Sequence, residues 1–547
     1  MISAKSMMTI KKYRLAFCVA LLLGAWTFAL SAVAADWPQW GGRNIRNMYS
    51  PQRGLPDAFG KIEFKSGTDE IGTNAIKNLK WIAKLGSQSY GNVTVAGGKV
   101  FVGTNNEPPR DPRHPGDRSI MLCFDEKSGA FLWQLVVPKL ASGKVNDWES
   151  LGLLASPTVE GDRVYIVTSR CEVMCLDVNG LANGNDGPFK DEARYVIKDV
   201  AAASPIDPGA QDADIIWVYD MMDELGVFPH NASNCSVLVV DDILYTCTSN
   251  GQDWTHSNIP SPNAPSLIAL NKKTGEFLGE DDAKIGLRIY HGQWGSPTLA
   301  EVNGKKLIVF GGGDGWCYAF DAKPVKTPDG PFLKTAWKYD CNPPEFKVDK
   351  DGKPIKYPAS EGPSEINATP VFYQNRVYVA VGQDPEHGEG VGNLTSIDAT
   401  QTGDVTKTAK IWEYRGIHRS ISTVSIDPDT GLVFVADFSG FLYCLDAGTG
   451  KVYWTHDMKA HMWGSTMVAD GKVYAGDEDG DLVVMAASKN KQVASETNVG
   501  APVYGTPIIA NGVIYLQSNT HLFSFFDPTK QAGFKDEPQK LDLKLDQ

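Results

Sequence analysis

The stretch from Leu432 to Trp454 reads LVFVADFSGFLYCLDAGTGKVYW and contains two short apolar strands separated by tight turns. Apolar and small residues alternate on either side of the turn DFSG, and the second turn, AGTG, leads to a third short strand that contains a tryptophan. Alternation with a period of two, bounded by Gly and Asp turns, indicates β-strands. Similar stretches occur at residues 99–133, 163–177, 306–321 and 472–486.

These stretches are copies of one repeat, which indicates a repeat architecture for the whole chain. Each copy has room for four short antiparallel strands, and such units arranged radially form the blades of a β-propeller. The copies align on the residue that opens the innermost strand of each unit. Eight units result, opening at Gly91, Ala155, Cys235, Gly295, Ala368, Ile421, Gly464 and Gly505.

The two ends of the repeat array complement each other. The last unit stops after its third strand, near Phe525, and residues 79–84 resemble a fourth strand without the other three. Pairing the two would close the ring and leave no open sheet edge. We therefore predict an all-β, eight-bladed propeller over residues 79–528, closed by an N-terminal strand in the last blade. An N-terminal extension (35–78) precedes it and a polar tail (529–547) follows.

The N-terminus has the features of an export signal. Lys11, Lys12 and Arg14 precede an apolar run from Leu15 to Leu30, and Ala32-Val33-Ala34 offers a small-residue cleavage site. The alternative, a membrane anchor, is disfavoured because the run falls short of the roughly 20 residues that span a bilayer. We predict a signal peptide at 1–34, no transmembrane segment, and a mature periplasmic or secreted protein that is monomeric.

Charge and cysteine positions limit the function classes further. The chain has 52 Lys and Arg against 65 Asp and Glu, a net charge of −13, which disfavours binding to nucleic acid or anionic lipid. Cys123, Cys175 and Cys444 occupy one repeat position, and equivalent points on different blades are too far apart for a disulfide. We expect small buried core residues there, while local pairing of Cys171 with Cys175, or Cys235 with Cys247, stays open.

The repeat motif also points to a family. The segment Cys444-Leu-Asp446-Ala-Gly-Thr-Gly450-Lys-Val-Tyr-Trp454 resembles the tryptophan-docking motif of quinoprotein (PQQ-type) propellers. The opening segment, with Asp36-Trp37 and later Tyr49-Ser50-Pro51, is similar to that of quinoprotein alcohol dehydrogenases. The same blades occur in the non-catalytic scaffold BamB and in secreted PQQ-like repeat proteins of planctomycete-type bacteria. In this motif the tryptophans Trp133, Trp337, Trp412 and Trp454 serve packing between blades.

The resemblance to the dehydrogenases implies a site in the central channel for PQQ and a calcium or lanthanide ion. Asn250 is the match for the metal-binding Asn, but no Glu matches and no two cysteines are adjacent. The catalytic Asp would follow Trp294, where this chain has Gly295, and the second acid of some members would fall at Pro297. The departures affect the residues that do the chemistry, so the family mechanism is not expected here.

Polar residues near the predicted channel mouth are the remaining candidates. Glu365, His418 and His461 lie three residues before the opening residue in units five to seven, which predicts that they point to a common axis. Such a set can bind a metal or do acid–base work, and a solvated funnel is the alternative. Arg419 and Trp463 flank the set. Together with Asn250, the residues Glu365, His418 and His461 are the candidate metal ligands.

Two segments are expected to reach the same mouth, the insertion at 250–266 and the connector at 227–234. The stretch IYHGQWGSP, residues 289–297, leads into the inner strand of the fourth unit and is interpreted as a wall of the pocket. These segments complete the predicted ligand-binding set with His230, Asn250, Asp253, Trp254, His256, His291 and Trp294.

The sequence thus favours an exported propeller that binds a small molecule or a protein partner at the channel mouth. The alternative is a PQQ-dependent or PQQ-like oxidoreductase that uses a non-standard channel site. A hydrolytic or lyase-type propeller is a third class and depends on the His and Glu residues alone.

Overall fold

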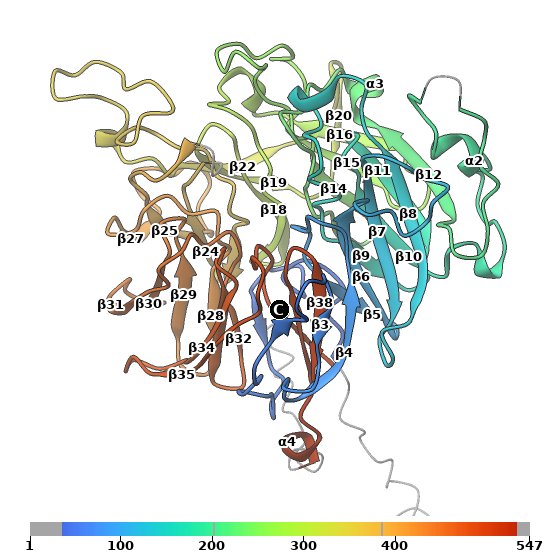
Figure 1. Cartoon of the computed structure of the whole chain (residues 1–547). Helices are drawn as coiled ribbons and strands as arrows, with labels where there is room; N and C mark the ends of the chain where they lie inside the picture. The colour runs from blue at the N-terminus through green and yellow to red at the C-terminus, as the bar shows by residue number, and fades with distance from the viewer. Residues whose placement is uncertain (1–34, 201–202, 384–386, 533–547) are drawn as a thin grey trace, which may run out of the picture.

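A computed structural model describes residues 35–200, 203–383 and 387–532 of the chain, and eight β-sheets of four or more strands lie around a common centre (Figure 1). The predicted eight-bladed propeller is confirmed, and each blade is a meander of four antiparallel strands. Blade one comprises β5 (Thr94–Ala96), β6 (Lys99–Asn105), β7 (Arg118–Asp125) and β8 (Phe131–Pro138), and blade two comprises β9 (Thr158–Glu160), β10 (Arg163–Val167), β11 (Glu172–Asp177) and β12 (Ile215–Asp220). Blade three comprises β13 (Leu238–Val240), β14 (Ile243–Cys247), β15 (Leu267–Asn271) and β16 (Phe277–Asp281). Blade four comprises β17 (Thr298–Val302), β18 (Lys305–Gly311), β19 (Trp316–Asp321) and β22 (Thr335–Asp340).

The remaining blades follow the same order from the innermost strand outward. Blade five comprises β23 (Val371–Tyr373), β24 (Arg376–Ala380), β25 (Leu394–Asp398) and β27 (Lys410–Tyr414), and blade six comprises β28 (Ser425–Asp427), β29 (Leu432–Ala436), β30 (Phe441–Asp446) and β31 (Val452–Asp457). Blade seven comprises β32 (Met467–Ala469), β33 (Lys472–Gly476), β34 (Asp481–Ala486) and β35 (Val493–Asn498). Blade eight comprises β36 (Ile508–Ala510), β37 (Val513–Gln517), β38 (His521–Phe525) and β4 (Leu79–Lys84).

Several short strands, helices and turns lie outside the four-stranded cores of the blades. The additional strands are β1 (Tyr49–Ser50), β2 (Glu63–Phe64), β3 (Ile71–Gly72), β20 (Val325–Thr327), β21 (Gly330–Leu333) and β26 (Gly403–Asp404). The short helices are α2 (Glu192–Tyr195), α3 (Met221–Leu225) and α4 (Pro528–Ala532), with 3₁₀ turns η1 (Gly143–Val145), η2 (Gly180–Asn183), η3 (Ile285–Leu287) and η4 (Pro344–Phe346).

The ring closes as predicted, because β4 forms the outer strand of the last blade. It pairs antiparallel with β38, from Leu79 opposite Phe525 to Lys84 opposite His521. The first and last parts of the propeller therefore lie side by side, which Figure 1 shows as a blue strand next to a red one. Sharing one sheet between the two ends leaves no unpaired edge at the seam.

Tryptophans on outer strands join several blades to the next one, as the repeat motif implied. The indole N–H of Trp454 in blade six donates to the carbonyl of Ser488 in blade seven at 2.8 Å. Gly450, at a φ of +73°, packs against the ring of Trp412 from blade five, and a Cβ there would come within 2.7 Å of that ring. The motif spacing thus lets Gly450 pack against the tryptophan of the preceding blade, while Trp454 contacts the following blade.

All eight cysteines of the described residues are free and buried, which confirms the interpretation as core residues. The local pairs left open by the sequence are not formed; the backbone N–H of Cys247 instead donates to Sγ of Cys235 at 3.2 Å. Burial raises the pKa of both the Cys171 and Cys175 thiols to about 12. They are therefore neutral, small hydrophobic groups in the core.

The N-terminal extension closes one end of the central channel. Residues 35–48 run across the ring and hydrogen-bond to every blade in turn, which binds the blades together far from the seam. The contacts to blades one to eight are Trp37 with Val95, Pro38 with Val159, Asn44 with Val239, Asn44 with Leu299, Ile45 with Phe372, Asn47 with Ile426, Met48 with Val468 and Ala35 with Asn511.

Arg46 anchors this segment from a fully buried position. Its guanidinium donates five hydrogen bonds of 2.6–3.3 Å to oxygen acceptors, among them the carbonyls of Pro297 and Val237 in two different blades. Burial lowers the pKa of Arg46 to about 10, so the group stays charged at neutral pH. A buried cation is tolerated there because carbonyl dipoles surround it.

Arg46→Ala is expected to lower the free energy of unfolding by about 2–4 kcal/mol, because it leaves buried carbonyls without donors. Urea unfolding followed by tryptophan fluorescence measures the change. Arg53→Ala is the matched control: its exposed pair with Asp429 should contribute less than about 1 kcal/mol. Equal losses in the two variants would contradict the anchoring role of Arg46.

His521 begins β38, where the ring closes, and is only 5% exposed. Its ring lies edge-on to Phe64 at 5.8 Å between centroids. Burial, and to a lesser extent nearby Lys84, lower the pKa of His521 to about 4, while Asp69 acts in the opposite direction. An unfolded histidine titrates near pH 6.5, so between pH 6.5 and 4 the unfolded chain binds more protons than the folded one.

The free energy of unfolding is therefore expected to decrease as the pH drops from 6.5 to 4. Below pH 4, His521 causes no further decrease. His521→Gln should remove up to about 3 kcal/mol of that decline, since glutamine does not titrate. Urea unfolding at pH 8, 6, 5 and 4 for both proteins measures the difference. Parallel curves for the wild type and the variant would contradict a buried neutral His521.

Candidate functional site

The central channel contains a cavity of about 450 Å³, built from the same two positions of every blade. One position directly precedes the residue that opens each inner strand and the other directly follows it. Residues two apart on an extended chain point to the same side, here toward the axis. The upper ring consists of Tyr90, Leu154, Asn234, Trp294, Asn367, Ile421, Trp463 and Tyr504, and the lower ring of Asn92, Ser156, Ser236, Ser296, Thr369, Thr423, Ser465 and Thr506.

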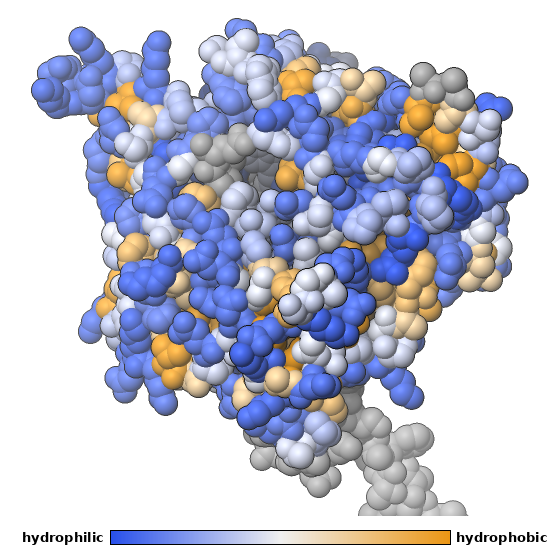
Figure 2. Space-filling model, in the orientation of Figure 1, coloured by the Kyte–Doolittle hydropathy of each residue, from blue (hydrophilic) through white to orange (hydrophobic). Residues whose placement is uncertain are grey.

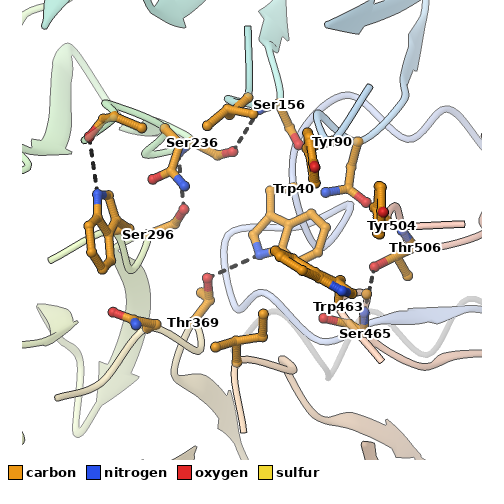
Figure 3. Close-up of a pocket in the computed structure, with 18 of the residues that line it drawn as sticks. Trp40, Tyr90, Ser156, Ser236, Ser296, Thr369, Trp463, Ser465, Tyr504 and Thr506 are labelled. Atoms are coloured by element: carbon orange, nitrogen blue, oxygen red, sulfur yellow. Dashed lines mark hydrogen bonds between the residues drawn. The ribbon is translucent and has the colours of Figure 1, made fainter. Parts of the chain in front are cut away.

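The lower ring is held together by its own side chains (Figure 3). The backbone N–H of Ser465 donates to the hydroxyl of Thr506 at 2.8 Å, and the N–H of Ser156 does the same to Ser236 at 3.0 Å. Six such links of 2.6–3.2 Å join neighbouring blades around the axis. They fix the register in which each inner strand faces the channel.

This ring corrects the alignment in blade six. The prediction placed the opening residue at Ile421, but Thr423 takes the lower-ring position, since its hydroxyl accepts from the N–H of Thr369 at 3.2 Å. The opening residue is therefore Ser422, and Ile421 lines the cavity instead. The other blades open with Gly, Ala or Cys, whereas blade six has serine within the sequence ISTV, so the pattern did not reveal the one-residue shift.

Aromatic side chains form much of the cavity wall and its floor. Tyr90 and Tyr504 stack at 4.6 Å between centroids, and Trp463 meets Tyr504 edge-on at 5.1 Å. The floor is Trp40, from the N-terminal extension, whose indole N–H donates to the hydroxyl of Thr369 at 3.1 Å. In Figure 3 this indole lies in the centre of the labelled hydroxyl residues.

The described residues that line the cavity include polar side chains but no charged one. They comprise four asparagines, four serines and three threonines, and no Asp, Glu, His, Lys, Arg or Cys. Burial raises the pKa of Tyr90 to about 12, which keeps this phenol neutral. The cavity therefore offers ring faces and neutral hydrogen-bonding groups.

The predicted set of Glu365, His418 and His461 does not converge. His418 Nδ1 lies 2.9 Å from the Asp437 carboxylate, and His461 Nδ1 lies 2.7 Å from that of Glu478. Each histidine thus pairs with a carboxylate of its own blade, and His461 Nε2 also lies 3.5 Å from the carboxylate of Glu389 in blade five. The shift in blade six also places His418 four residues before the opening residue and not three, so the shared register was wrong.

Glu365 and Arg419 are buried next to the cavity and serve local contacts. The Tyr357 hydroxyl donates to the Glu365 carboxylate at 3.3 Å. The Arg419 guanidinium donates to the Ser364 hydroxyl at 3.1 Å and also to the carbonyl of Ala359. Within the described part of the chain, neither residue belongs to a cluster of three metal-ligand groups.

The two segments expected at one mouth do meet there. Pro229 and Asn250 form an antiparallel bridge, and the Asn250 side chain accepts from the N–H of Phe228 at 3.0 Å and donates to the carbonyl of Ser261 at 2.9 Å. Asn250 thus holds the two segments together. The structure places three of the predicted residues in one cluster: His230, His256 and His291.

Three other predicted residues lie at the cavity or its rim. Trp294 and Trp463 line the cavity, with indole N–H groups donating to the Ala232 carbonyl and the Glu478 carboxylate at 3.0 Å each. Trp254 is 55% exposed and lies 6.5 Å from the ring of Trp148. Asp253 accepts hydrogen bonds from Thr255 and Asn258 within its own loop.

Sequence reasoning missed several residues that line the cavity: Trp40, Tyr90, Trp148 and Tyr504. For Tyr90 and Tyr504 a signal exists, because both occupy the repeat position of Trp294 and Trp463, directly before the opening residue. Trp40 and Trp148 come from outside the repeat, so no repeat position indicates them.

Comparison with known proteins agrees with this architecture. The family described as outer membrane protein assembly factor BamB matches residues 409–493 and 438–531, the C-terminal blades. The crystal structure of BamB from Moraxella catarrhalis is similar with a TM-score of 0.50 and 13% identity, covering 82% of this chain and 99% of that one. The quinohemoprotein alcohol dehydrogenase from Comamonas testosteroni has a TM-score of 0.44 and 16% identity, covering 90% and 80%.

Among proteins of curated function, none matches the sequence significantly. In the described residues, no helix is both long enough and apolar enough to cross a membrane.

Proposed function

We propose that this chain, a β-propeller of the PQQ-like repeat type, is an exported binding protein that holds a neutral, ring-bearing small molecule in its central cavity. The observation that carries the proposal is the lining of the cavity, in which aromatic faces and amide and hydroxyl groups occur together and none of the described residues is charged. The volume of about 450 Å³ falls within the range of about 300–1,000 Å³ for small-molecule sites.

The wall chemistry suits a flat or ring-shaped neutral ligand. Trp463 and the stacked Tyr90–Tyr504 pair offer ring faces, and an aromatic pair contributes about 0.5–1.5 kcal/mol beyond the area it buries. Asn234 and Asn367, on the opposite side of the upper ring, supply amide donors and acceptors. An aromatic ring or a sugar ring would satisfy both, whereas a charged ligand would lose its hydration without a counter-charge.

Access is proposed from the side of the 250–266 loop, because Trp40 and the N-terminal segment close the opposite end. Trp148 and the exposed Trp254 lie at that side, with the ammonium group of Lys144 3.4 Å from the ring centroid of Trp148. These groups form the rim past which a ligand enters.

The residues present do not fit PQQ with a metal ion. PQQ carries three carboxylates, and calcium or a lanthanide needs carboxylate oxygens as ligands. Among the lining residues that the structure describes, there is neither a basic side chain for the first nor a carboxylate for the second. The redox alternative is therefore not favoured, and the cavity supports binding without quinone chemistry.

The outer surface also favours a small molecule over a protein partner. On the face shown in Figure 2, apolar residues form small separate patches among hydrophilic ones. Of the large apolar side chains exposed in the described residues, Leu287 lies between blades three and four, Ile411 on β27 of blade five and Val493 on β35 of blade seven. Export rests on the signal-like segment 1–34, which lies outside the described residues.

Tryptophan fluorescence tests the proposal, since Trp40, Trp148, Trp294 and Trp463 all line the cavity. The chain from Ala35 onward is titrated with N-phenyl-1-naphthylamine as a neutral aromatic probe, with cellobiose as a neutral sugar, and with PQQ plus calcium. At least one neutral probe should cause saturable quenching at a 1:1 ratio. Trp463→Ala should weaken that binding at least about tenfold, through the loss of one stacking face.

Trp316→Ala is the matched control, because Trp316 lies on β19 and contacts Lys338 outside the cavity. Its affinity should equal that of the wild type, with both variants retaining the wild-type thermal midpoint. Binding of PQQ with calcium in preference to both neutral probes would overturn the proposal, and so would the absence of any saturable binding.

A further inference from the structure

We infer that His230, His256 and His291 form a binding site for a divalent transition-metal ion, separate from the central cavity. One ligand nitrogen from each of the three side chains lies within 4.8 Å of the other two. The ring centroids are 4.1 Å apart for His230 and His291, 4.8 Å for His256 and His291, and 5.1 Å for His230 and His256.

The three rings meet at steep angles and not as a stack. The interplanar angles are 64°, 74° and 66° for the same three pairs. Ligand nitrogens around a tetrahedral zinc ion lie about 3.3 Å from one another, given zinc–nitrogen bonds of about 2.0–2.1 Å. Nitrogens already within 4.8 Å reach that spacing through small side-chain rotations.

The backbone on each side is held in place. The His230 N–H donates to the Ser249 carbonyl at 3.2 Å, and the Gln252 N–H donates to the His291 carbonyl at 2.8 Å. These bonds tie the connector before β13, the 250–266 loop and the connector before β17 to one another. His256 has a φ of +52°, a left-handed backbone that non-glycine residues adopt at some cost and that often marks functional positions.

His230 also has the supporting contact typical of a metal ligand. Its Nδ1 lies 2.7 Å from the carbonyl oxygen of Gln252. A carbonyl only accepts, so Nδ1 carries the proton and the lone pair of the neutral ring is on Nε2. Ligating histidines commonly donate their second N–H to a carbonyl in this way, which fixes the tautomer and the ring orientation.

The residue types decide which ion suits the cluster. His230 and His291 are buried, with 0% and 1% exposure, and His256 is exposed. Imidazole nitrogens suit zinc, copper, nickel and iron, whereas calcium and magnesium prefer oxygen ligands.

Aromatic neighbours surround the cluster. The ring of His387 is 4.5 Å from that of His291, and Tyr357 is 5.8 Å from it on the same side. Trp294, a wall of the central cavity, lies 5.7 Å from His291. An ion held here would lie behind that wall and clamp the loops around the mouth.

A second group of ligand-type side chains, Asp111, His114 and Asp212, does not share these properties. The Arg113 guanidinium lies between the two carboxylates, 2.6 Å from Asp111 and 3.0 Å from Asp212. The cation that this group binds is thus its own arginine, and we infer no metal there.

The test uses the chain from Ala35 onward, stripped with a chelator and titrated with Zn²⁺ in competition with a chromophoric chelator. One Zn²⁺ per chain should bind, and Co²⁺ should give the visible absorption of a low-coordinate nitrogen site. His256→Ala should weaken Zn²⁺ binding at least about 100-fold, since losing a direct ligand costs no less than losing a supporting contact. His256 is exposed, so this variant is expected to fold.

His456→Ala is the matched control, because His456 lies on β31 in the outer part of blade six. It should bind Zn²⁺ as the wild type does, and Zn²⁺ should raise the thermal midpoint of the wild type and this control but not of His256→Ala. No stoichiometric binding, or equal affinity in His256→Ala and His456→Ala, would overturn the inference. Either result is independent of binding in the central cavity, which neutral probes report.

Discussion

The hydrogen bond from a backbone N–H at the start of one inner strand to the side-chain oxygen of the next blade governs this structure. Repeated around the axis, it sets the distance between blades and the direction in which each inner strand faces the channel. The residue two positions earlier must then point to the axis as well, because alternation on a strand has a period of two. The upper ring and the lower ring of cavity-lining side chains both follow from this one contact.

The repeat made much of the fold predictable. Eight blades, the closing strand at 79–84 and the buried cysteines all followed from patterns that recur along the chain. What does not recur was harder to predict. The N-terminal segment crosses every blade, yet only its distant hydrogen bonds, such as Arg46 to Val237, define its path. The shift from Ile421 to Ser422 arose because blade six opens with a serine, where the other blades open with Gly, Ala or Cys.

The site illustrates the same division. Trp294 and Trp463 were predicted because their repeat position was recognised, and the tyrosines at that position follow the same rule. His230, His256 and His291 were predicted as separate members of the mouth, but their meeting depends on the paths of one loop and two connectors. A pattern gives the position of a residue along a strand, and it does not give the course of an insertion. Glu365, His418 and His461 were grouped by sequence register alone, and local carboxylates pair with the two histidines instead.

The central claim is that the channel is a neutral binding site, although the blades resemble those of quinoproteins. Native mass spectrometry tests it most directly, on the protein purified from a host that makes PQQ and grown with calcium. The lining predicts that no PQQ remains bound and that any retained organic molecule is uncharged. One PQQ per chain, surviving transfer to the gas phase, would contradict the account.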